Sequence, residues 1–454
     1  MADQKFFTAP LKTDKMPPGI PYIIGNEAAE RFNYYGMRAI LVVFMTQYLR
    51  DRSGSLAVMS DSDANFWYHI FNATNYSLPV IGAILADAYW GKYPTIIWLS
   101  LVYCVGSLVL AYDSTRLGLG IGLGLIAIGS GGIKPCVSAH VGDQFSSDNQ
   151  HRLARAFGWF YFSVNAGALV SMYCTPRWLK DHGSALAFGM PAAMMLLATF
   201  VFWSGRYKFA HIPPAGKAFF RENFNPEGWS IIGRIAGIYA FVAVFWSLYE
   251  QSGGEWVLQA EKMDLRCTLF GHTFEVLSSQ IQTINGIFIL ILIPVFQYWI
   301  YPAVSRIFPL TPLRKIGLGM VVTAASFLIS ARIESQITAG LKPGIEWQLF
   351  AYLLLSAGEV MVSITGLEFA YTQAPKRMKS VVMSLYLLAI AAGDLFTGLV
   401  QLFIQNKDHT SKLPGAWFYL FFAGLCFLTA IVFAFVARLY RGQAYLPDES
   451  RGST

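Results

Sequence analysis

Long apolar runs recur along the whole chain and are separated by short polar segments. Each run of about 20 residues is long enough to cross the hydrocarbon core of a bilayer. Because that core offers no water to unpaired backbone groups, such runs must be helical. The pattern predicts an all-α polytopic membrane protein with about twelve spans, at residues 22–49, 63–88, 93–113, 116–144, 151–174, 184–206, 228–258, 275–302, 312–332, 347–375, 378–406 and 414–441.

The longest polar connection, RYKFAHIPPAGKAFFRENFNPEG, follows the sixth predicted span. It predicts a basic linker at 207–227 between an N-terminal six-helix bundle at 1–206 and a C-terminal one at 228–454. An even number of spans leaves both termini on one face. About 19 Lys and Arg residues fall on that face and about 11 on the other, so the positive-inside rule predicts cytoplasmic termini.

Composition supports this class of protein. The chain has 454 residues, of which 55% are hydrophobic and 13% charged, about half the charged fraction of a soluble protein. The net charge of +7 is spread over loops, as in other membrane proteins, so it does not indicate nucleic-acid binding.

We expect no cleavable signal in the polar first 20 residues. The cysteines and histidines form no metal-binding motif, and no metal or other cofactor is expected.

The first span nevertheless contains four charges, in the stretch EAAERFNYYGMR. Glu27, Arg31, Tyr34 and Arg38 fall at intervals that place them on one helical face, with Glu30 beside them. Charges at membrane depth are costly unless they face a cavity or a partner. The stripe therefore predicts a polar cavity; the simpler alternative is an internal Glu27–Arg31 ion pair alone.

Other predicted spans carry polar groups at comparable depth, and together they predict one shared cavity. The cations lie in the first half and Glu359 in the second; Glu368, nine residues later, faces the opposite side of its helix. Such a cavity fits a ligand with a carboxylate at one end and an ammonium group at the other. Besides Glu359, the groups considered are Tyr68, His69, Lys134, Asn165, Glu250, Glu255 and Asn285.

The junction of the second and third spans reads GAILADAYWGK. Its glycines, aspartate and Gly-Lys pair are similar to the signature loop of the major facilitator superfamily. That resemblance implies twelve transmembrane helices in two six-helix bundles that rock about a central site. Asp87 is then expected to be part of a conformational latch, or gate, rather than a ligand site.

Longer motifs resemble the proton-dependent oligopeptide transporter (POT/PTR) family. EAAERFNYYG fits its first signature, and GSGGIKPCVSAHVGDQF with FYFSVNAGAL fits its second. GLEFAYTQAP fits the tenth-helix region. The Tyr68-His69 pair is closer to animal-type members, and the short linker leaves no room for the two extra helices of many bacterial members.

The resemblance implies a monomeric plasma (inner) membrane symporter, not an enzyme, that imports di- and tripeptides with protons as the coupling ion. It implies that Arg31 and Lys134 hold the peptide carboxylate and that Glu359 and Asn285 hold its amino terminus. The remaining implied roles are backbone contacts (Tyr34, Tyr35, Tyr68, Asn165), proton coupling (Glu27, Glu30, His69) and an outward gate (Arg38 with Glu250 or Glu255). His69 could instead only orient a neighbour.

Two positions depart from the family pattern. Tyr386 replaces a tryptophan of the eleventh helix, and SITG replaces a proline-containing segment of the tenth. Bending there is expected to depend on Gly358 and Gly366. Among other functions, a small-anion symporter would leave Glu359 unexplained, an enzyme would need a nucleophile–base pair or a metal site, and a peptide sensor would not need the coupling glutamates.

Overall fold

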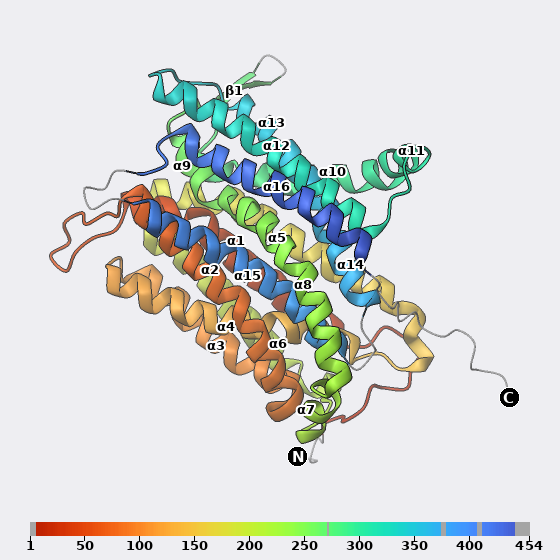
Figure 1. Ribbon diagram of the computed structural model, residues 1–454. Coiled ribbons are helices and arrows are strands. Elements are labelled where there is room, and N and C mark those ends of the chain that lie inside the picture. Colours follow the sequence, from red (N-terminus) through yellow and green to blue (C-terminus); the bar gives the residue numbers. More distant parts are fainter. Residues whose placement is uncertain (1–5, 270–271, 374–377, 406–410, 441–454) are drawn as a thin grey trace.

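A computed structural model describes residues 6–269, 272–373, 378–405 and 411–440 (Figure 1). Nearly all of the described chain is helical. Twelve of the helices are α1 (Ile20–Gln47), α2 (Asp61–Ile84), α3 (Lys92–Tyr112), α4 (Arg116–Gly142), α5 (Leu153–His182), α6 (Ser184–Ser204), α8 (Pro226–Tyr249), α10 (Thr283–Val295), α12 (Pro312–Thr338), α13 (Glu346–Glu359), α15 (Lys379–Ile404) and α16 (Ala416–Leu439). The short helices are α7 (Lys217–Asn223), α9 (Glu255–Glu261), α11 (Tyr301–Ser305) and α14 (Thr365–Thr372).

Nine helical stretches within the described ranges are long and apolar enough to cross a membrane. The other three predicted spans form the long helices α1, α2 and α5, whose sequences are more polar. These three helices include the first-span charges and His69. The polarity of α1 and α2 thus includes groups buried in the protein interior, whereas the charged residues of α5, such as Arg155 and Arg177, are exposed.

Several helix starts follow directly from local sequence. Ser60, Thr115 and Thr311 accept hydrogen bonds from backbone N–H groups of the first turns of α2, α4 and α12. Such caps satisfy N–H groups that have no partner within the helix. Pro226 and Pro312 begin α8 and α12, where a missing N–H costs nothing.

Four predicted spans contain an irregular helical turn, and in the second span it is a π-helical segment, Leu85–Trp90, that follows α2 directly. The tenth consists of α13, a wider π-helical turn at Val360–Ile364, and α14. Another π-helical turn, Phe296–Ile300, separates α10 from α11. A 3-10 turn, Glu250–Gly253, separates α8 from α9. Each break changes the direction in which the following side chains point.

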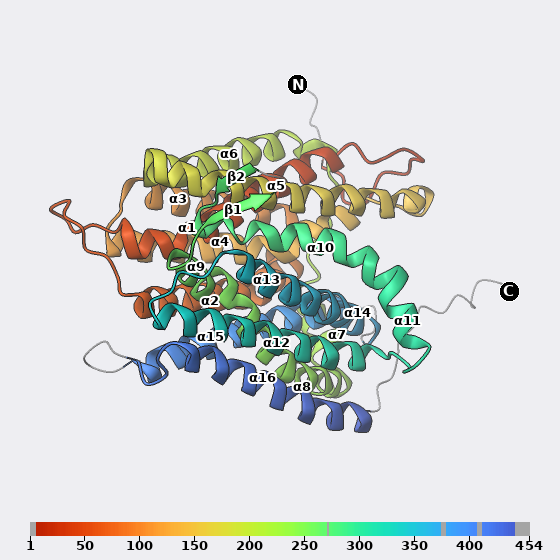
Figure 2. The same ribbon diagram turned by 90° about the horizontal axis from the view of Figure 1, so that it is seen from above.

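The helices pack in two groups that lie side by side in Figure 2. In the first group α1 packs against α5 and α6, and α4 against α2 and α3. In the second group α12 packs against α13 and α16, and α8 against α15. Buried apolar residues form one large cluster in each group, and α2 packs along α15 between the groups. The exact domain limits, with a linker at 207–227, stay a prediction.

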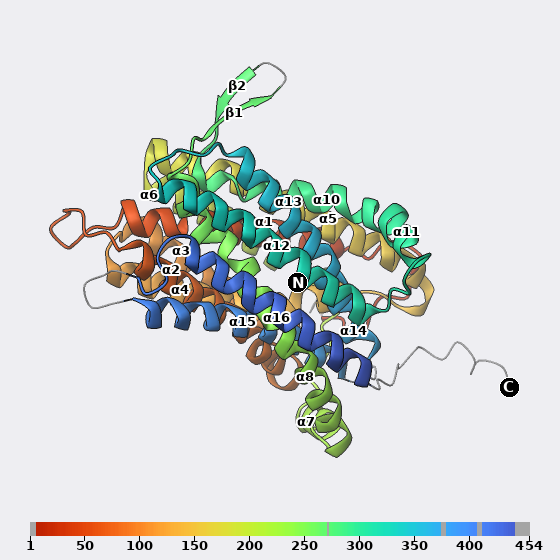
Figure 3. The same cartoon turned by 45° about the horizontal axis from the view of Figure 1, so that its top comes forward.

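A small antiparallel hairpin was not predicted from the sequence. Strand β1 (Arg266–Leu269) pairs with β2 (His272–Glu275), and Arg266 lies opposite Glu275. The hairpin projects beyond the helices between α9 and α10 (Figure 3). It lies at the end of the molecule opposite the two termini.

Candidate substrate and proton site

The charged face of α1 forms a compact cluster. Arg31 Nε lies 2.7 Å from a carboxylate oxygen of Glu27 and 3.2 Å from one of Glu30. Ser130 on α4 donates a further hydrogen bond to Glu30 at 2.8 Å. The Glu27–Arg31 pair considered as the simpler alternative is therefore present, but a second carboxylate shares the same arginine. Two buried acids therefore share one arginine as their direct ion-pair partner, and a further cation or a proton is needed to balance their charge.

Lys134 reaches this region because α2 and α4 approach very closely. A Cβ on Gly82 would lie 2.4 Å from the backbone oxygen of Gly132, so only glycine fits there. The Lys134 ammonium lies 4.0 Å from the centre of the Tyr34 ring and 4.5 Å from that of Tyr76. Aromatic faces attract a cation but do not neutralise it. Within the described part of the chain, Lys134 Nζ is buried and forms neither a hydrogen bond nor a direct ion pair, so Glu27 and Glu30 act on it only across a longer distance.

The second group of helices holds an uncompensated acid. Asn285 donates hydrogen bonds to Glu359 at 2.9 Å and to Ser356 at 3.0 Å. Its own side-chain oxygen accepts one from Tyr249 at 3.3 Å. These contacts orient the Glu359 carboxylate at the end of α13, just before the π-helical turn. Among the described residues, no Lys or Arg forms an ion pair with Glu359.

Aromatic side chains surround this acid. Trp246 packs edge-on against Tyr249, and its ring centre lies 5.9 Å from that of Tyr386. The Tyr386 hydroxyl donates a hydrogen bond to Ser363 Oγ at 2.9 Å, inside the π-helical turn. Tyr386 therefore anchors the π-helical turn within the interrupted tenth span. Gly366 lies close to the same ring.

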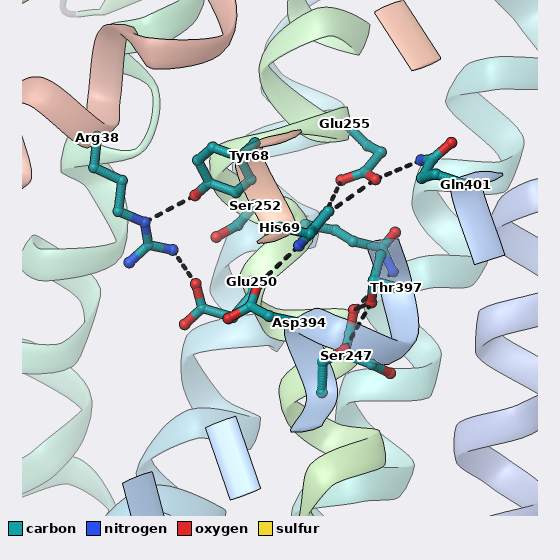
Figure 4. A network of polar contacts seen from close by, with 12 residues as sticks. Arg38, Tyr68, His69, Ser247, Glu250, Ser252, Glu255, Asp394, Thr397 and Gln401 are labelled. Carbon is teal, nitrogen blue, oxygen red and sulfur yellow. Dashed lines mark hydrogen bonds and ion pairs between the residues drawn. The ribbon is translucent and has the colours of Figure 1, made fainter. Parts of the chain in front are cut away.

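A buried ion pair links the two groups of helices. Arg38 pairs with Glu250 and donates a hydrogen bond to the Tyr68 hydroxyl at 2.8 Å (Figure 4). A Cβ on Gly253 would overlap the Tyr68 hydroxyl, so this turn needs glycine there. Of the two seventh-span acids considered as partners of Arg38, the structure pairs it with Glu250.

Glu255 instead contacts His69. His69 Nε2 lies 3.2 Å from Glu255, and Nδ1 lies 2.8 Å from Asp394 on α15 (Figure 4). Gln401 donates to Glu255 at 2.7 Å. Ionised carboxylates only accept hydrogen bonds, so both histidine contacts require one more proton than a neutral imidazole carries. His69 does not orient Tyr68 through a hydrogen bond, because both of its ring nitrogens contact the carboxylates of Asp394 and Glu255 instead.

Asp394 is the functional candidate that the sequence analysis missed. Its side chain is fully buried. It stands as a lone acid in the apolar stretch LLAIAAGDLFTGLV, which is itself a signal of function in a membrane span. Its partner His69 lies 325 residues away in sequence, so no local spacing could have indicated the pair.

The other predicted site residues lie apart from these contacts or at their margin. Tyr35 packs against Tyr34 with ring centres 5.4 Å apart. Asn165 donates to the backbone oxygen of Tyr161 within its own helix. Asp87 lies 3.7 Å from Lys92, which also pairs with Asp143. The side chain of Glu368 lies outside the described residues.

Polar contacts between the two groups cluster toward the end opposite the termini. Gln47 donates to Glu261 at 2.8 Å, and Lys262 lies 3.3 Å from Asp61. Gln280 donates to the backbone oxygen of Tyr173 at 2.8 Å. Together with the pairs of Arg38 and His69, these contacts close the molecule at that end.

No group of three or more His, Cys, Asp or Glu side chains that could hold a metal occurs in the described residues.

The fold and this set of buried charges define a multi-pass membrane transporter of the major facilitator type. The family model for the POT family matches residues 93–232 and 225–414, and the chain belongs to that family. This is a family of transporters rather than enzymes.

Curated relatives support the animal-type resemblance. The chain is 36% identical to peptide transporter family 1 of Drosophila melanogaster over 71% of its length and 48% of that protein. It is 37% identical to solute carrier family 15 member 2 of Danio rerio, over 70% of this chain and 50% of that one. The chain thus spans about half the length of these curated relatives.

Solved structures share the fold over nearly the whole chain. An auto-inhibited POT family peptide transporter has a TM-score of 0.84 at 32% identity, covering 95% of this chain and 99% of that one. A second POT family transporter has a TM-score of 0.82 at 33% identity, covering 94% of this chain and 99% of that one.

Proposed function

We propose that this chain is a proton-coupled symporter that imports di- and tripeptides by alternating access. The observation that carries the proposal is two buried charged groups of opposite sign, neither of which forms a direct ion pair among the described residues. Lys134 in the first group has no carboxylate partner among the described residues, and Glu359 in the second has no cationic partner there. Buried unpaired charges are costly, so a ligand that supplies both partners would bind with a large gain.

A peptide backbone has that chemistry, with a carboxylate at one end and an ammonium group at the other. Lys134, with Arg31, would hold the carboxylate. Glu359, oriented by Asn285, would accept hydrogen bonds from the ammonium group. Tyr34, Tyr35, Tyr68 and Asn165 would line the backbone between these poles. A small inorganic anion would leave Glu359 without a partner, which argues against an anion symporter.

Proton coupling would arise at the Glu27, Glu30 and Arg31 cluster. While both acids are ionised, they hold Arg31. Protonation of one acid removes part of that attraction and frees Arg31 to bind the peptide carboxylate. A proton moving down 100 mV provides about 2.3 kcal/mol, which corresponds to roughly fifty-fold accumulation.

His69 would add a second proton-binding group at the contacts between the two groups of helices. Its carboxylate neighbours belong to the second group, so a change in its proton occupancy would alter how firmly the groups are joined. The Arg38–Glu250 pair would form the outward gate beside it. Alternating access then means breaking these contacts at one end while new ones form at the other, near Asp87.

The orientation and setting are part of the proposal. The excess of Lys and Arg on the face that carries both termini supports cytoplasmic termini in the plasma (inner) membrane. The site lies within one chain, so a monomer would suffice for transport, and the coupling ion would be a proton rather than any bound cofactor.

The test is uptake of labelled dialanine into proteoliposomes containing the full chain. An inward proton gradient should drive accumulation, and a protonophore should abolish it. Lys134→Ala should abolish both driven uptake and exchange, because it removes half of the carboxylate clamp. Accumulation that persists without any gradient would overturn the symport proposal, and unimpaired uptake by Lys134→Ala would overturn the proposed binding mode.

A further inference from the structure

A surface groove unconnected with the proposed peptide site runs between α12 and α16. Figure 2 shows these two helices side by side at the edge of the second group. One hollow has a volume of about 570 Å³ and is lined by apolar residues such as Leu318, Val321 and Ile431. A second hollow of about 410 Å³ continues the groove and shares Val321. Small residues on both helices keep it open, among them Gly317, Ala434 and Gly424.

The groove faces outward, toward the lipid. The side chains of Leu318, Val321 and Ile431 remain about 40% exposed. Both helices are long enough and apolar enough to cross a membrane. The natural occupant of a long apolar groove on such a surface is a hydrocarbon chain.

One end of the groove is strongly basic. Arg314 and Arg438 both line it there, close to the start of α12 and the end of α16. Arg314 donates one hydrogen bond to the backbone oxygen of Pro309 and stacks over Phe308. Arg438 lies over Phe435. Neither guanidinium has a carboxylate partner within the described ranges.

The sequence stretches that directly precede and follow Arg314, and that lead up to Arg438, are free of acidic residues. Residues 276–333 and 411–440 contain neither Asp nor Glu. The guanidinium group binds phosphate with two parallel hydrogen bonds, and it does so better than an ammonium group. Two arginines at the mouth of an apolar groove therefore combine a phosphate site with a hydrocarbon site.

We propose that this groove binds one anionic diacyl phospholipid, with its phosphate on Arg314 and Arg438 and an acyl chain between α12 and α16. The arginines lie on the face that carries the termini. If that face is cytoplasmic, they meet the leaflet in which anionic lipids are concentrated. The lipid site itself does not depend on that orientation or on peptide transport.

The test is native mass spectrometry of the delipidated full chain, titrated with phosphatidylglycerol and with phosphatidylcholine of the same acyl chains. The wild-type chain should bind the first phosphatidylglycerol more tightly than phosphatidylcholine. Arg314→Gln/Arg438→Gln should weaken phosphatidylglycerol binding roughly thirty-fold, at about fivefold per arginine near an anionic headgroup. Phosphatidylcholine binding should change little.

Matched variants separate this site from general charge effects. Arg155→Gln/Arg221→Gln removes two exposed arginines from other helices and should leave the lipid preference unchanged. Ala434→Phe fills the groove without changing charge and should weaken binding of both lipids, whereas Ala193→Phe on α6 should not. If the double arginine variant does not fold, the two phenylalanine variants still test whether lipid binds in this groove. Lipid binding that Ala434→Phe and Ala193→Phe weaken equally would contradict the proposal.

Three results would overturn the proposal. The first is equal loss of phosphatidylglycerol binding in both double arginine variants. The second is displacement of phosphatidylglycerol by inorganic phosphate, which would indicate an anion site without a lipid. The third is a dimer of the chain that Ala434→Phe dissociates, which would show that a second copy occupies the groove.

Discussion

Glu359→Gln isolates the charge that we assign to the peptide amino terminus. Glutamine has nearly the same shape, and its oxygen can still accept the 2.9 Å hydrogen bond from Asn285. The substitution therefore removes the negative charge while the local structure is retained. A hydrogen bond to a charged group contributes about 1.5–3 kcal/mol, so a free dipeptide should bind roughly 10 to 150 times more weakly.

The comparison ligand is the same dipeptide with an acetylated amino group, which has no ammonium charge to lose. Its affinity should be nearly the same in wild type and Glu359→Gln. Binding can be measured by calorimetry on the purified protein, with Glu261→Gln as a control that removes an exposed carboxylate at the closed end. Equal weakening of both ligands would refute the assignment, because it would mean that Glu359 supports the structure rather than the ammonium group.

The remaining predictions concern coupling and gating. Glu27→Gln and Glu30→Gln should each abolish gradient-driven uptake but preserve dipeptide exchange, measured in the same proteoliposomes; retained accumulation in both would refute the switch. Because a carboxylate favours a charged imidazole beside it, Asp394→Asn should shift the pH dependence of driven uptake toward more acidic values; an unchanged profile would make Asp394 purely structural. Glu250→Ala should destabilise the protein by about 3–5 kcal/mol because it leaves a buried arginine unpaired. Arg38→Met/Glu250→Leu should recover most of that loss in thermal unfolding.

Much of the fold followed from hydropathy, because a membrane restricts a spanning chain to helices. The charged face of α1 also followed from spacing alone, since its members share one helix. The breaks in the spans did not follow. A π-helical turn such as Val360–Ile364 rotates the side chains that follow it, because its local hydrogen bonds differ from those of an α-helix. Such a turn leaves no clear pattern of hydrophobic residues in the sequence. The β1–β2 hairpin is too short for its pattern to stand out from a loop.

The candidate site was only partly predictable, because it depends on local breaks in the helices and on contacts between distant segments. Glu250 and Glu255 are both plausible partners for Arg38 on a regular helix, but the 3-10 turn between them sends them to different partners. The contact between His69 and Asp394 depends on how α2 packs along α15. Such tertiary contacts are decided by packing between distant segments, which a single sequence does not reveal.

The most direct test of the central claim is the proton movement that accompanies peptide. Proteoliposomes with a pH-sensitive dye inside, and no initial proton gradient, would be given dialanine on the outside. The account predicts acidification of the lumen as peptide enters, absent from liposomes that contain Lys134→Ala. Peptide entry without any change in internal pH would contradict proton-coupled symport.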